Sequence, residues 1–184
     1  MSLKMIRAAA CLELMDEPHE ARLLLLLFAA AKKTNRPIDG LTKLAKLDFL
    51  LRYPNCLERA LLATKKDPDK AKIQPYERAN IETKMIRFRY GPWDHRYRRW
   101  IALLIARGLV QTAIEGRTVR VRLTERGRSV ADSIVEHAEY SDIAERSRTI
   151  AKEFSHMSGT RLKEFIYEVF PELADMRWGE EIVL

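Results

Sequence analysis

The stretch from residue 94 to residue 125 constrains the fold most, because its pattern changes from helical to extended and back within a short span. Apolar residues recur at spacings of three and four up to Gly108, which predicts an amphipathic helix over residues 95–107. Asp94 stands where it can cap the first turn of this helix. The apolar stripe of the predicted helix consists of Tyr97, Trp100, Ile101, Leu104 and Ile105.

A two-stranded hairpin is predicted directly after this helix. Residues 109–114 form its first strand, Glu115 and Gly116 its turn, and residues 117–123 its second strand. Side chains of the second strand alternate between an apolar face and a polar, mostly basic face. The apolar face carries Val119, Val121 and Leu123, and the other carries Thr118, Arg120 and Arg122. Thr124 and Glu125 then begin a helix that runs to about residue 138.

The order helix, hairpin, helix predicts a winged-helix unit, with the hairpin as the wing. The fold class is therefore mainly α with a small β-hairpin (α+β): a winged helix-turn-helix with an insertion and a C-terminal helical extension. The winged-helix domain spans residues 1–138, and its insertion covers about residues 55–94. Residues 139–184 form the C-terminal helical extension, which we expect to serve partner docking or dimerisation.

Three helices are predicted over the first 65 residues. Residues 18–33 are apolar on all sides between Leu23 and Ala31, so that helix should be buried. A loop over residues 35–40 leads to a second helix, residues 41–53, which Pro54 stops. Its expected cap is Asp39 or Thr42, and Asn55 is the expected cap of a third helix over residues 56–65.

The remainder of the insertion is less regular. Residues 66–75 are charged and carry two prolines, which predicts a mobile linker, and residues 76–85 predict a further helix. Residues 86–90 alternate as an extended segment does, and residues 91–94 are typical of a turn. In a compact winged helix the third helix follows the second after a short turn. The insertion therefore weakens the prediction of a groove-binding helix more than the prediction of a DNA-contacting wing.

Positive charge is concentrated in one quarter of the chain. Between Lys84 and Arg128, 12 Lys/Arg stand against 3 Asp/Glu, a net of +9, although the whole chain carries only +7. From Ser129 to the end, 6 basic residues stand against 12 acidic ones, a net of −6. A segregated basic block is typical of a protein that meets nucleic acid or a membrane surface, and a solvated arginine-rich face is the alternative.

The placement of these cations predicts DNA as the partner. A recognition helix enters the major groove by its N-terminal residues while the wing contacts the backbone. Guanidinium forks suit phosphate and guanine edges, and phosphate contacts position a protein without reading bases, so we expect weak sequence preference. If about six phosphates are neutralised, affinity should fall ~10³-fold between low and moderate salt. The predicted DNA-binding residues are Arg87, Arg89, His95, Arg96, Arg98, Arg99, Arg117, Arg120 and Arg122.

Three alternatives stay open at this point. Arg87 and Arg89 can instead pair with acids of the C-terminal part. Trp93, Trp100 and Tyr97 fit a core better than they fit a base-stacking surface. The basic surface as a whole can bind an acidic protein in place of DNA.

The sequence predicts a protein that is not an enzyme and needs no cofactor or metal. Its four histidines, His19, His95, His137 and His156, have no ligand spacing, and no nucleophile motif or phosphate-binding glycine loop is present. A lone carboxylate such as Asp48 on an apolar face is more often a satisfied structural acid. Cys11 and Cys56 form no disulfide framework. The apolar run 23–31 is shorter than the roughly 20 residues of a bilayer span, so we expect a soluble, cytoplasmic protein with no membrane partner.

Five segments occur in an order that is similar to a known family. They are residues 40–51 (GLTKLAKLDFLL) behind an apolar helix, residues 82–94, residues 107–110 (RGLV), the hairpin, and residues 139–156 with Arg146 and Phe154. Over about residues 20–156 this pattern resembles the middle component of bacterial ABC-three-component systems. The similarity lies in pattern and order and not in a single diagnostic string.

The resemblance implies a small winged-helix accessory subunit between an SMC-like ABC ATPase and an effector subunit in anti-phage or anti-plasmid defence, as in Lamassu-type systems. It transfers no catalytic residue. One alternative is a transcriptional regulator of the same fold, which would bind a promoter palindrome as a homodimer and prefer that promoter by ~10³-fold or more. Another is a protein-only interaction module such as an antitoxin.

Overall fold

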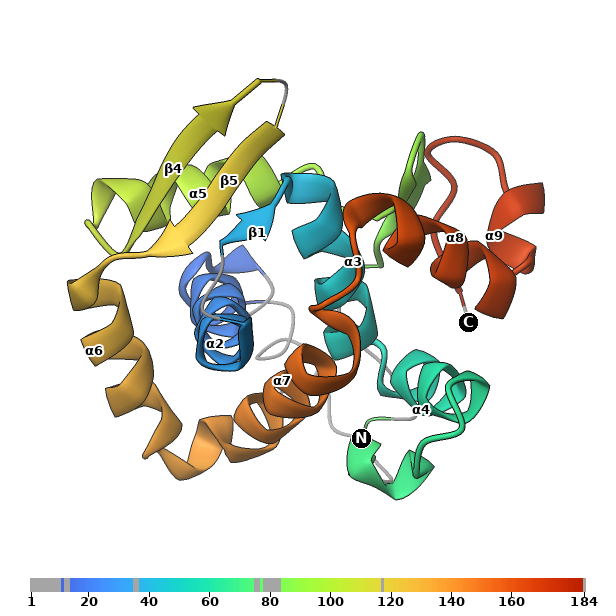
Figure 1. Cartoon of the computed structure of the whole chain (residues 1–184), viewed down its shortest axis with the longest axis horizontal. Helices are drawn as coiled ribbons and strands as arrows, with labels where there is room; N and C mark the ends of the chain where they lie inside the picture. Colours follow the sequence, from blue (N-terminus) through green and yellow to red (C-terminus); the bar gives the residue numbers. More distant parts are fainter. Residues whose placement is uncertain are drawn as a thin grey trace.

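The chain folds into a set of helices around small antiparallel sheets, which is the α+β class that the sequence predicts (Figure 1). The structure is a computed structural model and describes residues 11, 14–34, 37–74, 77, 84–116 and 118–183. The helices are α2 Glu17–Thr34, α3 Leu41–Arg52, α4 Pro54–Ala63, α5 Tyr97–Ala106, α6 Glu125–Val135, α7 Ser141–Phe154, α8 Gly159–Val169 and α9 Glu172–Asp175. The strands are β1 Ile38–Asp39, β2 Ile86–Phe88, β3 Gly91–Trp93, β4 Val110–Glu115 and β5 Thr118–Leu123, and two short 3-10 helices are η1 Pro68–Ala71 and η3 Ala138–Tyr140.

Helix α2 is the centre of the fold. It is buried from His19 to Ala30, as its all-round apolar sequence predicts. It packs against α6 and α7, which flank it in Figure 1. The C-terminal helices belong to the same hydrophobic core, because α7 also contacts α3, and α8 contacts both α3 and α4.

The hairpin β4–β5 is the predicted one to within a residue at each strand end. A third strand joins it, because Ile38 of β1 pairs with Val121 of β5, which gives an antiparallel sheet of order β1-β5-β4. The prediction of a loop over residues 35–40 was therefore wrong at Ile38 and Asp39. A two-residue strand is too short to show an alternating pattern.

Two expected helix caps were also wrong. Gly40, not Asp39 or Thr42, occupies the cap position of α3, and no side chain bonds to the first turn there. Tyr53 rather than Asn55 precedes α4, because Pro54 is the first residue of that helix. Proline suits this position, since the first N–H of a helix has no partner within the helix.

The insertion is more ordered than predicted where the structure describes it. Residues 68–71 of the expected linker form η1, which packs against α4 and buries Ala71. The predicted helix over residues 76–85 lies largely outside the described residues. Residues 91–93, expected in a turn, form strand β3, which pairs with β2 from Ile86↔Trp93 to Phe88↔Gly91.

The C-terminal tail extends this second sheet. Glu181 forms an antiparallel bridge with Ile86. The backbone N–H of Arg87 donates to the Glu180 carbonyl at 2.7 Å, and the N–H of Ile182 donates to the Met85 carbonyl at 2.8 Å. Segments of the insertion and of the C-terminal extension, far apart in sequence, therefore form one structural unit.

A close backbone contact joins the hairpin to α6. Thr124 caps α6 as predicted, and its Oγ1 accepts a 2.9 Å hydrogen bond from the Gly127 N–H. A Cβ atom at Gly127 would lie 1.9 Å from the carbonyl oxygen of Leu109. Only glycine allows the start of α6 to approach the start of β4 this closely.

Candidate nucleic-acid interface

Helix α5 is held by a buried polar cluster at Asp48. The Asp48 carboxylate on α3 accepts from Nε of Arg22 at 2.7 Å and from Nη2 of Arg22 at 3.2 Å. It also accepts from the Tyr97 hydroxyl of α5 at 2.5 Å. Burial, and the neighbouring Asp48 charge, raise the pKa of Tyr97 well above its ordinary value. Asp48 is thus a satisfied structural acid, as expected from the sequence.

A second buried cluster fixes the turn that leads into α5. Arg52 of α3 donates to Asp94 Oδ2 at 2.9 Å, and Arg96 donates to both carboxylate oxygens at 3.1 and 2.9 Å. Burial alone would raise the pKa of Asp94, but the bonds from Arg96 and Arg52 outweigh it and hold that pKa below its ordinary value. Asp94 also accepts the backbone N–H of Arg96 at 2.9 Å, so it orders this turn although α5 begins only at Tyr97.

The predicted cations at the start of α5 have different surroundings. The guanidinium of Arg96 is committed to Asp94 and lies 4.9 Å from the centroid of the Trp100 ring. Arg99 pairs with Asp16 at 2.6 Å, whereas His95 is exposed beside Asp94. Arg98 is exposed and forms no ion pair with any residue that the structure describes. Carboxylates therefore neutralise the charges of Arg96 and Arg99 at this helix start, whereas Arg98 has no such partner among the described residues.

Of the predicted cations on the hairpin, one is paired with carboxylates and one is not. Arg120 pairs with Asp39 at 3.1 Å and with Glu115 at 2.5 Å. Arg122 is exposed, and within the described part of the chain no carboxylate pairs with it. Arg117 lies outside the described residues.

Arg87 is engaged by the C-terminal part of the chain. Its Nε donates to the Leu173 carbonyl at 2.7 Å, and its guanidinium lies 5.4 Å from the centroid of the Tyr167 ring. The sequence offered the alternative that acids of the C-terminal part pair with Arg87. In the structure the Leu173 carbonyl and the Tyr167 ring contact it instead. Arg89 is exposed, with its guanidinium 5.3 Å from the centroid of the Tyr90 ring.

Two further arginines, which were not among the predicted site residues, follow Arg122 closely in the chain. Arg126 is exposed in the first turn of α6, directly after β5. Arg128 is partly exposed and, together with Arg122, lines a cavity of about 210 Å³ next to Leu27 of α2. We refer to Arg122, Arg126 and Arg128 as the hairpin surface. The sequence could have indicated these two residues, because in residues 122–128 (RLTERGR) the basic residues continue past the helix cap Thr124.

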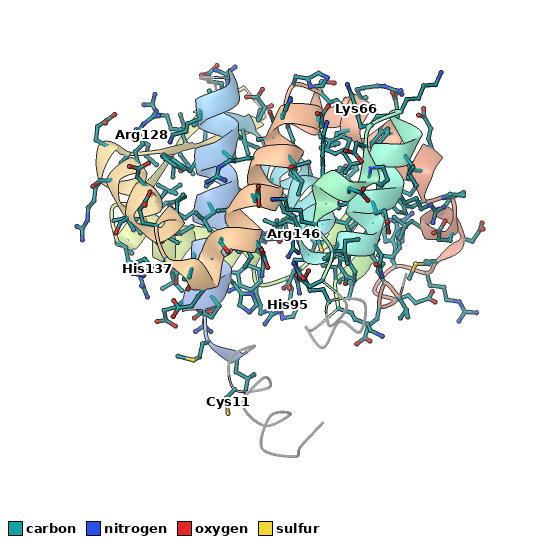
Figure 2. The ribbon with its side chains drawn as sticks, turned by 90° about the horizontal axis from the view of Figure 1, so that it is seen from below. Cys11, Lys66, His95, Arg128, His137 and Arg146 are labelled. Atoms are coloured by element: carbon teal, nitrogen blue, oxygen red, sulfur yellow. The ribbon has the colours of Figure 1, made fainter. Side chains whose placement is uncertain are left out.

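Within the described part of the chain, one ion pair involves the hairpin surface. Arg128 contacts Glu125 at 3.6 Å, and the Glu125 side chain is almost fully exposed. Such an exposed ion pair contributes little to stability, so a phosphate can readily replace Glu125 as the partner of Arg128. Figure 2 shows Arg128 at the upper left of the view and His95 at the lower edge of the folded part.

The described residues were also searched for other kinds of site. They contain no group of three or more His, Cys, Asp or Glu side chains placed to hold a metal ion. Of the helices described, none has both the length and the apolar character of a membrane span. Burial raises the pKa of the Cys56 thiol to about 12, so this side chain is unreactive at neutral pH.

Comparison of the chain with protein-family models, with curated proteins and with solved structures finds no match.

Proposed function

We propose that this protein is a non-enzymatic winged-helix subunit that contacts DNA through the hairpin surface. Following the sequence resemblance, we place it as the accessory subunit of an SMC-like ABC ATPase defence complex. The observation that carries the DNA part is the sheet order β1-β5-β4, with an exposed Arg122 on its central strand that no described carboxylate pairs with.

The order of the elements supports a winged helix beyond the hairpin alone. In chain order the helix α2, the strand β1, the helices α3 and α5, and the strands β4 and β5 supply the helix–strand–helix–helix–strand–strand series of that fold. The short strand β1 closes the sheet beside β5, which is where a winged helix needs it. The segments between α3 and α5 form an insertion.

Electrostatics favour the hairpin over helix α5 as the DNA contact. Arg99 of α5 pairs with Asp16, directly before α2, and Arg107, directly after α5, pairs with Glu17 and Glu20 in the first turn of α2. These carboxylates would repel a phosphate backbone that approached the exposed side of α5. Among the described residues, the three arginines of the hairpin surface form one ion pair, between Arg128 and the exposed Glu125, so we expect backbone contact with weak sequence preference.

An exposed aromatic patch supports the docking part of the proposal. Phe88, Tyr90 and Trp178 are 45%, 45% and 67% exposed, and the ring centroids of Phe88 and Trp178 lie 6.4 Å apart. Aromatic side chains are enriched at the centres of protein interfaces. The patch lies on the unit formed by β2 and the C-terminal tail, and we propose that it meets a partner subunit.

The DNA contact is tested by titrating the purified protein into a labelled random-sequence duplex at several salt concentrations. Three phosphate contacts predict that the logarithm of the binding constant falls with the logarithm of salt with a slope of about −3. A transcriptional regulator would instead prefer its own promoter by ~10³-fold or more. No binding at low salt would refute the proposed DNA contact.

The docking contact is tested by co-expression with the SMC-like ATPase of the proposed complex. Trp178→Ala and Phe88→Ala should abolish co-purification, because truncation of interface aromatics commonly costs ~2 kcal/mol or more. Leu62→Ala is the control, since Leu62 is an exposed apolar residue on α4 outside the patch. Unchanged co-purification of the aromatic variants would exclude this patch as the docking surface.

A further inference from the structure

A second pocket lies away from the hairpin surface, between α2, the end of α6 and α7. Its volume is about 290 Å³, and its floor is apolar, with Phe28, Val135 and Ala144 among the lining side chains. Pockets that hold small molecules begin at about 300 Å³. The space therefore fits a compact ligand and not a large cofactor.

Three cations surround this apolar floor. They are Lys32 of α2 and Arg148 and Lys152 of α7. Lys32 Nζ lies 4.3 Å from the centroid of the Phe28 ring and 3.4 Å from Asp132. Arg148 and Lys152 are exposed, and among the residues that the structure describes no carboxylate pairs with either.

The spacing of Arg148 and Lys152 is unfavourable in the absence of an anion. They stand four residues apart on α7, where two like charges face each other and destabilise the helix. Asp132, which pairs with Lys32 at this rim, is exposed, so that contact is weak. The pocket thus combines an apolar interior with an excess of positive charge at its rim.

We propose that this pocket binds a small amphipathic anion, a carboxylate with a compact apolar body. The apolar body would occupy the space beside Phe28 and Ala144, and the carboxylate would lie between Arg148 and Lys152. A nucleic-acid backbone lacks an apolar group that could fill this floor, so the pocket differs in chemistry from the hairpin surface. The proposal does not depend on the proposed function.

Calorimetric titration with octanoate tests the site, with octanol as the uncharged probe of the same length. Octanoate should bind at least tenfold more tightly than octanol, since only octanoate can use the cations. Inorganic phosphate should fail to displace octanoate at equal concentration, since it has no apolar body. Equal binding of octanoate and octanol, no saturable binding of octanoate, or its displacement by equimolar phosphate would overturn the proposal.

Variants assign the binding to the named residues. The double substitution Arg148→Gln with Lys152→Gln should weaken octanoate binding at least tenfold and leave octanol unchanged. The control Lys70→Gln with Arg161→Gln removes two exposed cations that do not line the pocket. It should change neither the octanoate affinity nor the octanol affinity. Ala144→Leu should reduce both affinities by filling the floor, and circular dichroism checks its fold. An unchanged octanoate affinity in the Arg148 and Lys152 double variant refutes the site even if Ala144→Leu does not fold.

Discussion

The Tyr97 hydroxyl donates a 2.5 Å hydrogen bond to the Asp48 carboxylate and thereby joins α5 to α3 inside the core. Both side chains are buried, and Arg22 of α2 binds the same carboxylate. One acid therefore fixes three helices relative to one another. A buried carboxylate is tolerated only where donors satisfy it, as the Arg22 guanidinium and the Tyr97 hydroxyl do here.

Removal of this acid should destabilise the protein far more than removal of the hydroxyl. Asp48→Ala should lower the free energy of unfolding by ~3–5 kcal/mol, because it deprives the buried Arg22 guanidinium of its carboxylate. Tyr97→Phe should cost ~1–2 kcal/mol, because Arg22 still satisfies Asp48. Urea unfolding of each variant measures both values. Equal effects of the two substitutions would show that the ion pair is not the dominant contact.

The contact between α6 and the hairpin predicts a difference between two glycines. Gly127→Ala should destabilise the protein by ~3 kcal/mol or more, because its Cβ would lie 1.9 Å from the backbone oxygen of Leu109. Gly159→Ala, in the first turn of α8, meets nothing within 4 Å and should be neutral or stabilising. Thermal unfolding followed by circular dichroism compares them. A Gly127→Ala protein as stable as the wild type would contradict the close approach.

The buried Lys46 makes stability depend on pH on the alkaline side. Burial, and the nearby Lys163 charge, lower the pKa of Lys46 from 10.5 to about 8. Between these two values the unfolded chain holds more protons than the folded protein, so the free energy of unfolding should rise as the pH rises from 8 towards 10.5. Lys46→Met should remove this rise and stabilise the protein at pH 7 by up to ~3 kcal/mol.

The measurement is urea unfolding at pH 7.5, 8.5 and 9.5 for the wild type and the variant. The Lys43 pKa is also lowered by burial, and the wild-type minus Lys46→Met difference removes its contribution. Lys70→Met, at an exposed position, should leave the wild-type slope intact. Parallel stability curves for the wild type and Lys46→Met would show that Lys46 is not the group responsible.

Local pattern was sufficient to predict most helices and the β4–β5 hairpin. Helix α2, both hairpin strands and the Thr124 cap follow from periodicity and capping residues, which act over a few positions. Strand β1 was missed because two residues cannot display a period, and its partner β5 lies far along the chain. Strand β3 was predicted as a turn because Gly91 and Pro92 are typical turn residues. In the structure the turn between β2 and β3 lies at residues 89–90.

The site was harder to predict than the fold because its charges are set by distant partners. Arg99 meets Asp16, which lies 83 positions earlier, and Arg87 meets the Leu173 carbonyl, 86 positions later. A sequence pattern shows where cations are dense but not which of them a remote carboxylate offsets. Arg126 and Arg128 could have been included from the sequence, since they continue the basic run of β5 beyond Thr124.

The most direct test of the DNA contact is a charge-reversal comparison on random-sequence duplex. One variant carries Arg122→Glu, Arg126→Glu and Arg128→Glu, and its control carries Lys70→Glu, Arg161→Glu and Arg177→Glu, three exposed positions elsewhere. Both change the net charge equally, so only the location of the lost cations differs. The hairpin variant should lose detectable binding, and the control should keep a salt slope close to the wild-type value of about −3. Equal loss of affinity in the two variants, or full binding by the hairpin variant, would contradict a DNA contact at the hairpin surface.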